Sequence, residues 1–107
     1  MGLFFGEMMR HKYHAVRCEY DGLKFPSKKE GQRYQELKLM RDIGTVVMFL
    51  RQPSFDIPGG VKYSADFLVF WADGNVSVED VKGVQTKEFI RNKKIVEALY
   101  PVKIEVI

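Results

Sequence analysis

The chain has 107 residues, of which 46% are hydrophobic and 29% are charged, with 17 basic and 14 acidic side chains. This length fits one compact domain with its own core and leaves no room for a second one. No apolar run approaches the roughly 18 residues of a transmembrane helix, and the amino-terminal charges follow the apolar residues, which is the wrong order for a secretory signal. We therefore expect a cytoplasmic protein, and its net charge of +3 is compatible with an anionic partner without indicating one.

Residues 1–26 are expected to form an amino-terminal arm followed by a β-hairpin. The segments VRCEY and LKF flank Asp21 and Gly22, a pair typical of a tight hairpin turn. The lone Cys18 cannot form an internal disulfide, and we interpret it as a small, half-buried residue. His11 and His14 could be metal ligands or a general base, but we interpret them as surface residues of the arm.

A helix is predicted to begin after Ser27. Glu30 lies three residues later and completes a capping-box pattern, while Gly44 marks the end of the helix. Between them, apolar residues recur at helical spacing: Tyr34, Leu37, Met40 and Ile43.

Three strands rich in β-branched and aromatic residues are predicted to follow: residues 45–57, 61–71 and 76–82. A Pro-Gly-Gly turn separates the first two strands, and a turn around Asp73 and Gly74 separates the last two. One face of the middle strand is expected to carry aromatic core or interface residues: Tyr63, Phe67 and Trp71.

A second amphipathic helix is predicted from Thr86 to Leu99, with Phe89, Val96 and Leu99 facing the core. Pro101 ends this helix, and the last residues of the chain form a final strand. The order is thus helix, three strands, helix, strand. It predicts a mixed α/β fold in which two helices flank a central mixed sheet, rather than a repeated βαβ barrel.

Asp66, Asp80 and Lys82 are predicted to point to one side of the hairpin formed by the second and third strands. Alternation along a strand puts Asp80 and Lys82 on one face and Glu79 on the opposite face. If the connecting loop comprises residues 72–74, Asp66 lies directly opposite Asp80, with Cβ atoms roughly 4.5–5.5 Å apart. A two-residue loop would break this pairing.

Two carboxylates at this distance repel each other, and a hard cation such as Mg²⁺ relieves the repulsion. Such a cation usually keeps several waters, one of which can become a nucleophile. The Lys82 ammonium could orient that water and stabilise negative charge on a phosphate. The alternative is an ordinary Asp–Lys ion pair on a solvated strand, which the Asp-x-Lys tripeptide alone does not exclude.

Three stretches of the sequence carry a resemblance to a known family: DGLKFPSKKE, YSADF and VEDVKGVQT. Together with an acid in the first helix, they resemble the PD-(D/E)xK nuclease superfamily. They are more closely similar to a phage-encoded branch of it, which itself resembles Holliday junction resolvases. The αβββαβ order of that superfamily matches the order predicted for residues 27–107. The resemblance implies a restriction-endonuclease-like core within a single nuclease domain, residues 1–107, that hydrolyses DNA with Mg²⁺ or, in its place, Mn²⁺.

By position in the resemblance, Asp66 corresponds to the first acid of the motif, Asp80 to the (D/E) and Lys82 to the lysine. Ala65 stands where the motif has proline. Glu30 has two interpretations. It is either a residue of the helix cap or, as the resemblance implies, a helix-borne acid that joins Asp66 and Asp80 as a metal ligand.

Lys87, Arg91 and Lys94 lie at spacings of four and three in the second helix and form a basic stripe. Such a stripe can contact DNA phosphates with little dependence on sequence, although it can also be only a solvated helix face. Gln85, just after the lysine of the motif, could contact a phosphate or support the site.

These features predict an endonuclease that selects DNA by shape, with branched DNA as substrate, because no long insertion is visible that could read bases. A four-way junction is two-fold symmetric, so a resolvase-like enzyme is expected to be a homodimer. If the chain is phage-encoded, it would act in the host cytoplasm. The alternatives are a non-catalytic DNA-binding module on the same fold and a sequence-specific nicking or restriction-type endonuclease.

Overall fold

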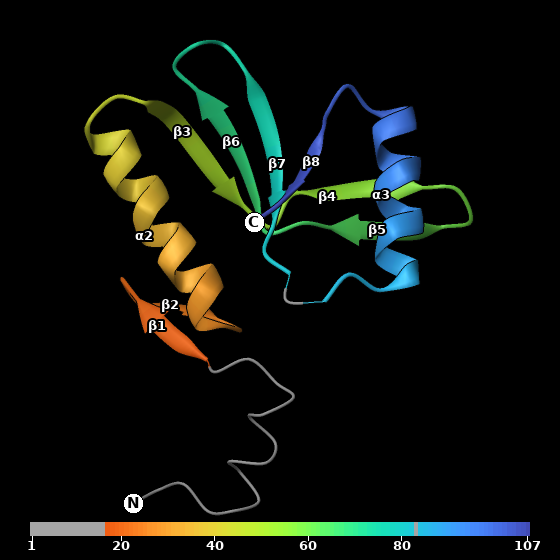
Figure 1. The fold of residues 1–107 in the computed structure, drawn as a ribbon, viewed down its shortest axis with the longest axis horizontal. Helices are drawn as coiled ribbons and strands as arrows, with labels where there is room; N and C mark the ends of the chain where they lie inside the picture. Colours follow the sequence, from red (N-terminus) through yellow and green to blue (C-terminus); the bar gives the residue numbers. More distant parts are fainter. Residues whose placement is uncertain (1–16, 83) are drawn as a thin grey trace, which may run out of the picture. The chain divides into compact units, whose positions relative to one another are not determined.

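The computed structural model of the protein describes residues 17–82 and 84–107. The chain divides into two compact units, Met1–Glu36 and Leu37–Ile107, which are described separately below (Figure 1). The predicted arm, with His11 and His14, lies outside the described residues. Within the described ranges, no helix is long and apolar enough to cross a membrane.

The first unit contains a hairpin at the predicted position. Strands β1 (Cys18–Tyr20) and β2 (Leu23–Phe25) pair antiparallel. Asp21 and Gly22 join them with φ angles of 55° and 76°, the left-handed conformation that this pair tolerates well. The buried Phe25 ring packs 4.9 Å from the ring of Tyr34, whose hydroxyl donates a hydrogen bond to Asp21 Oδ2 at 3.0 Å. The hairpin is therefore held against the helix that follows it.

Helix α2 (Lys28–Asp42) begins where the capping pattern predicts. The Ser27 hydroxyl accepts a hydrogen bond from the Glu30 backbone N–H at 3.0 Å, which satisfies one of the free donors of the first turn. Tyr34 and Leu37, two of the four predicted apolar positions, are buried.

Gly44 marks the end of helix α2, as predicted. Gly44, at φ +91°, closes the helix, with its N–H bonded to the Arg41 carbonyl and the Thr45 N–H bonded to the Met40 carbonyl. This is the Schellman arrangement, which leaves the preceding residue outside the regular helix. Ile43 therefore lies beyond the buried stripe and is 70% exposed, although it continues the helical spacing of Tyr34 and Leu37.

The second unit contains a four-stranded mixed sheet in the order β3-β6-β7-β8. Its strands are β3 (Val46–Arg51), β6 (Phe67–Trp71), β7 (Val76–Asp80) and β8 (Ile104–Val106). β3, β6 and β7 pair antiparallel, and β7 and β8 pair parallel. The central mixed sheet and the α/β class are therefore as predicted.

Two of the predicted strands are each divided in two. The predicted strands 45–57 and 61–71 separate into β3 and β4 (Ser54–Ile57) and into β5 (Val61–Ser64) and β6. β4 and β5 pair only with each other, as a separate two-stranded sheet. The break has a local cause, because Gln52 has a positive φ of 54° and Pro53 cannot donate to a strand ladder. Five strands, rather than three, thus stand between the two described helices.

Helix α3 (Lys87–Leu99) begins at Thr86, whose hydroxyl accepts the Phe89 N–H at 3.1 Å. It packs on a core shared with the sheet and the β4–β5 hairpin: Ile57, Tyr63, Ala65, Val78, Phe89, Val96 and Ile104. Leu99 was expected in this core but is 55% exposed. The chain leaves the helix at Tyr100, which is extended and packs its ring 5.2 Å from Phe55, so Tyr100 makes the core contact at this end.

Candidate functional site

The hairpin of β6 and β7 has the predicted register. Phe67 pairs with Glu79 and Phe70 with Val76, and the Trp71 N–H donates to the Asn75 carbonyl at 2.9 Å. The loop therefore comprises residues 72–74, the length on which the pairing of the acids depends. This regular register ends at the Phe67–Glu79 pair. The Asp66 N–H donates to the Glu79 carbonyl at 3.0 Å, one residue out of step with the ladder, so the predicted direct pairing of Asp66 with Asp80 is not part of it.

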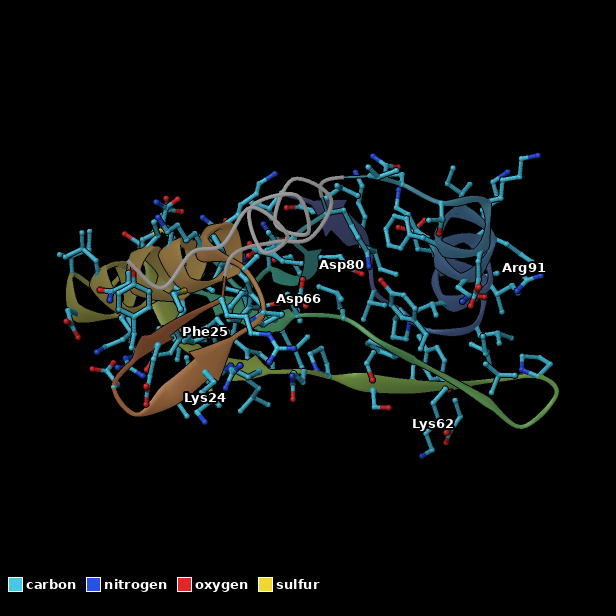
Figure 2. All side chains as sticks on the ribbon, turned by 90° about the horizontal axis from the view of Figure 1, so that it is seen from below. Lys24, Phe25, Lys62, Asp66, Asp80 and Arg91 are labelled. Atoms are coloured by element: carbon cyan, nitrogen blue, oxygen red, sulfur yellow. The ribbon has the colours of Figure 1, made fainter. Side chains whose placement is uncertain are left out.

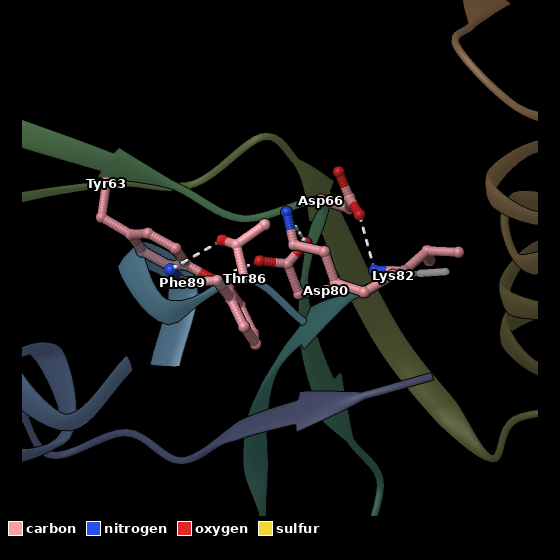
Figure 3. A network of polar contacts seen from close by, with 7 residues as sticks. Tyr63, Asp66, Asp80, Lys82, Thr86 and Phe89 are labelled. Atoms are coloured by element: carbon pink, nitrogen blue, oxygen red, sulfur yellow. Dashed lines mark hydrogen bonds and ion pairs between the residues drawn. The ribbon is translucent and has the colours of Figure 1, made fainter. Parts of the chain in front are cut away.

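Asp80 ends β7 as a buried acid with only 1% of its surface exposed. Its two carboxylate oxygens have different partners (Figure 3). Oδ2 accepts a hydrogen bond from the Tyr63 hydroxyl, and Oδ1 lies 3.5 Å from the Lys82 ammonium. β7 ends at Asp80, two residues earlier than predicted, but the lysine two residues along the chain still lies beside the acid, as expected.

Asp66 lies just before β6 and is half-buried. Its Oδ2 accepts the backbone N–H of Val81 at 2.6 Å, which holds the carboxylate against the chain segment between Asp80 and Lys82. Figures 2 and 3 show the two acids side by side at the end of the sheet. The structure therefore brings together the three residues that the sequence pattern singled out.

The electrostatics of this cluster oppose an ionised Asp80. Burial raises the pKa of the Asp80 carboxyl above its usual range, and the negative charge of Asp66 raises it further. The Tyr63 hydrogen bond and the Lys82 charge act in the opposite direction without cancelling the increase in pKa. Burial and the charge of Asp80 also raise the pKa of Tyr63, so the phenol remains a protonated donor at neutral pH. Additional positive charge near the acids would thus stabilise the site.

Lys82 connects the acids to helix α3. Its side chain is 34% exposed, and its ammonium lies 5.0 Å from the centre of the Phe89 ring. An ammonium over an aromatic face is held electrostatically while it remains accessible to a ligand. Lys82 is thus both oriented by the protein and open to solvent.

The acids are suited to a small, hard cation. Among residues 17–82 and 84–107, no group of three or more His, Cys, Asp or Glu side chains is arranged to hold a metal ion. Mg²⁺, however, is commonly held by one or two carboxylates and keeps several of its waters. Asp66 and Asp80 fit that requirement, because a buried carboxyl with a raised pKa beside a second carboxylate gains from a neighbouring cation.

Glu30 belongs to the other unit, so its role as a third ligand remains a prediction. It is buried, and its backbone N–H makes the hydrogen bond expected of the helix cap. Glu79 pairs with Phe67 in the ladder and alternates with Asp80, which puts it on the opposite sheet face, as predicted. It is 0% exposed, a degree of burial that the sequence did not indicate.

Sequence reasoning missed Tyr63 as part of the site. We expected it on one strand face with Phe67 and Trp71. The strand breaks between β5 and β6, and Tyr63 belongs to the core cluster beneath α3, whereas Phe67 packs against Phe49 and Trp71 bonds to Ser77. The sequence did not indicate that Tyr63 belongs to the site. The break between β5 and β6 changes which residues share a strand face, and the sequence did not predict that break.

The predicted basic stripe is exposed on α3. Lys87, Arg91 and Lys94 are all exposed on the helix, and Gln85 is exposed just before it. Figure 2 shows Arg91 on α3. These residues follow Lys82 directly along the chain. A cationic helix surface therefore belongs to the same unit as the acids.

Residues 10–107 match a family described as Protein of unknown function (DUF1064). The chain belongs to the DUF1064 family. No curated protein matches it in sequence. The DUF1064 match spans Glu30, both site acids, Lys82 and the basic stripe, so the candidate site lies within the part of the chain that defines the family.

Proposed function

We propose that this DUF1064 protein is a metal-dependent endonuclease that hydrolyses DNA phosphodiester bonds with a PD-(D/E)xK site. The observation that carries the proposal is the placement of Asp66, just before β6, beside Asp80, at the end of the neighbouring β7, with the Lys82 ammonium 3.5 Å from Asp80. A solvated Asp–Lys ion pair would not require a buried acid. Here Asp80 is buried against a second carboxylate despite the electrostatic cost.

The order of elements supports the same proposal. A helix is followed by antiparallel strands, a second helix and a last strand parallel to β7, which agrees with a restriction-endonuclease-like αβββαβ core. In this interpretation β3, β6 and β7 are the three core strands, and the β4–β5 hairpin is an insertion between the first and second. Asp66 then lies just before the second core strand and Asp80 at the end of the third, in keeping with the motif positions that the resemblance implies.

The side chains would act on the phosphate as follows. Mg²⁺ held by Asp66 and Asp80 would supply an activated water and neutralise phosphate charge. Lys82 is placed to donate hydrogen bonds to the attacking water or to a phosphate oxygen as negative charge develops there. Phe89 and Asp80 hold the ammonium in place before substrate binds, so little reorganisation is needed during the reaction.

The basic stripe is proposed to bind the DNA backbone. Replacing Lys87, Arg91 and Lys94 together by alanine should weaken binding about equally for different sequences. It should also reduce the slope of log K against log salt by about one per lost phosphate contact, or about three in total. Fluorescence anisotropy across a salt series measures both quantities. Lys62→Ala is the control, because Lys62 is an exposed lysine paired with Asp56 on the β4–β5 hairpin. An unchanged slope in the triple variant would exclude the stripe.

We further propose branched DNA as the substrate and a homodimer as the active form. Three exposed cations on one helix support backbone contacts rather than base reading, which favours recognition by shape. A four-way junction needs two symmetric cuts, and a two-fold dimer supplies two equivalent sites.

The test is cleavage of a labelled four-way junction beside a linear duplex of the same sequence, in Mg²⁺, Mn²⁺ or EDTA. We expect metal-dependent, paired cuts in the junction. Metal-dependent cutting of the linear duplex alone, at discrete positions, would retain the nuclease and replace the junction by a sequence-specific substrate. Binding of DNA without cleavage in any metal would leave only a DNA-binding module.

A further inference from the structure

We propose that Tyr63 is a positioning residue of this site, whose hydroxyl holds the Asp80 carboxylate in the orientation that leaves Oδ1 beside Lys82. This inference rests on the proposed nuclease function and extends it to a residue on a different sheet. Tyr63 lies on β5, in the two-stranded β4–β5 sheet, whereas Asp80 ends β7 of the four-stranded central sheet.

The two carboxylate oxygens of Asp80 have different partners, and this difference supports the inference. The carboxylate can rotate about its last bond, and its two oxygens are otherwise equivalent. In the structure, Tyr63 occupies Oδ2, and Lys82 lies beside Oδ1. The phenol thus determines which edge of the carboxylate remains available for a cation and for the lysine.

Tyr63 is itself held firmly enough for this role. It is 6% exposed, and its ring lies 6.5 Å from Phe55 and 6.3 Å from Phe89, measured between ring centres. The Lys82 ammonium lies over the same Phe89 ring, at 5.0 Å. One aromatic pair, Tyr63 and Phe89, therefore positions both the acid and the lysine of the motif (Figure 3).

Removing the Tyr63 hydroxyl should have the effect of removing any group that hydrogen-bonds to a metal ligand. Groups that hydrogen-bond to a metal-binding side chain orient it, and their loss commonly reduces metal affinity or activity by about 10- to 100-fold. The Tyr63 ring would continue to fill the core without its hydroxyl, so a Phe substitution separates positioning from packing.

The test compares Tyr63→Phe with Tyr100→Phe and the wild-type protein. Tyr100 is a matched control, because its ring also contacts Phe55 and its hydroxyl also donates a hydrogen bond, but to the Asp56 backbone carbonyl at 2.6 Å. Three quantities are measured for each protein: the Mn²⁺ dissociation constant by calorimetric titration, the Mg²⁺ concentration for half-maximal junction cleavage, and the melting temperature.

We expect Tyr63→Phe to weaken Mn²⁺ binding and to raise the Mg²⁺ requirement by about 10- to 100-fold, while Tyr100→Phe matches the wild type in both. If Tyr63→Phe binds and uses metal like the wild type, or if both variants lose function in proportion to their melting temperatures, the positioning role is overturned. A wild-type protein that neither binds Mn²⁺ nor cleaves DNA would instead overturn the proposed function, and the positioning role with it.

Discussion

Replacing Asp80 by asparagine should abolish cleavage and at the same time raise the thermal stability of the metal-free protein at neutral pH. Loss of a metal ligand removes several kcal/mol of transition-state stabilisation, which corresponds to a decrease in rate of about a thousandfold or more. The gain in stability has a separate cause. Asparagine keeps the shape of the side chain and can still accept the Tyr63 hydrogen bond, but it carries no charge into a buried position.

The sign of the stability change follows from the pKa of Asp80, which burial and Asp66 raise above its usual range. A carboxyl with a raised pKa in the folded state favours folding while it is protonated. That contribution is lost as the pH rises through the folded-state pKa. At any pH above the folded-state pKa, the ionised Asp80 therefore costs stability that asparagine does not. The advantage of Asp80→Asn should decrease as the pH falls into the acid range, where the wild-type carboxyl becomes protonated.

Melting curves in EDTA between pH 4 and pH 8 measure this difference, since each kcal/mol shifts the melting temperature of a domain of this size by about 4–8 °C. Glu79→Gln is the matched control, because Glu79 is the buried carboxyl immediately before Asp80 and lies on the opposite sheet face. We expect Glu79→Gln to retain metal-dependent cleavage. An Asp80→Asn protein that melts below the wild type at pH 7 in EDTA would contradict the argument. It would mean that Lys82 and Tyr63 stabilise the ionised acid by more than burial costs.

Replacing Lys82 by alanine should reduce cleavage by about 10²- to 10³-fold, the usual cost of losing one donor to a developing oxyanion. Metal binding should survive, and it should become no weaker, because the ammonium near Asp80 repels a bound cation. The fold should also persist. The contact of the half-exposed ammonium with Phe89 contributes only about 0.5–1 kcal/mol.

Single-turnover cleavage and Mn²⁺ titration on the same preparations separate these two effects. Lys62→Ala provides the control for loss of one positive charge from the same unit, since its ion pair with Asp56 is exposed on both sides. A Lys82→Ala protein that cleaves like the wild type would remove the lysine from the chemistry. A Lys82→Ala protein that has lost both cleavage and Mn²⁺ binding would show that Lys82 organises the acids instead of acting on the substrate.

Much of the site could be predicted from the sequence because it depends on local geometry. Two residues separated by one position on a strand share a face, which is why the sequence predicted that Asp80 and Lys82 point the same way. The strand ends at Asp80, but Lys82 lies only two residues later and its ammonium is 3.5 Å from that acid. The three-residue loop after Trp71 sets the register of β6 and β7, and that register brings Asp66, just before β6, to the end of β7 where Asp80 lies. The cap at Ser27 and the helix end at Gly44 are local for the same reason.

The breaks within the strands were not predicted. Pro53 lies inside an otherwise strand-like sequence, and Asp66 follows five residues of alternating pattern, so propensity alone favoured continuous strands. The tertiary structure instead separates β4 and β5 from the central sheet. Burial at the end of the second helix was also misjudged, since Leu99 fits the helical period but lies where the helix has left the core. Ile43 shows the same limit of the helical period, because it fits the spacing of the first helix and is nevertheless exposed.

By itself, the sequence determined the α/β class, the two described helices, the hairpin register and the shared face of Asp80 and Lys82, because each depends on residues close together in the chain. The tertiary structure alone decided that Asp80 is buried, that Tyr63 bonds to it from a separate sheet, and that Phe89 lies under Lys82. These features arise where β5, β7 and α3 meet. No residue spacing in the sequence predicts that these three elements lie together, because their positions depend on how the elements pack.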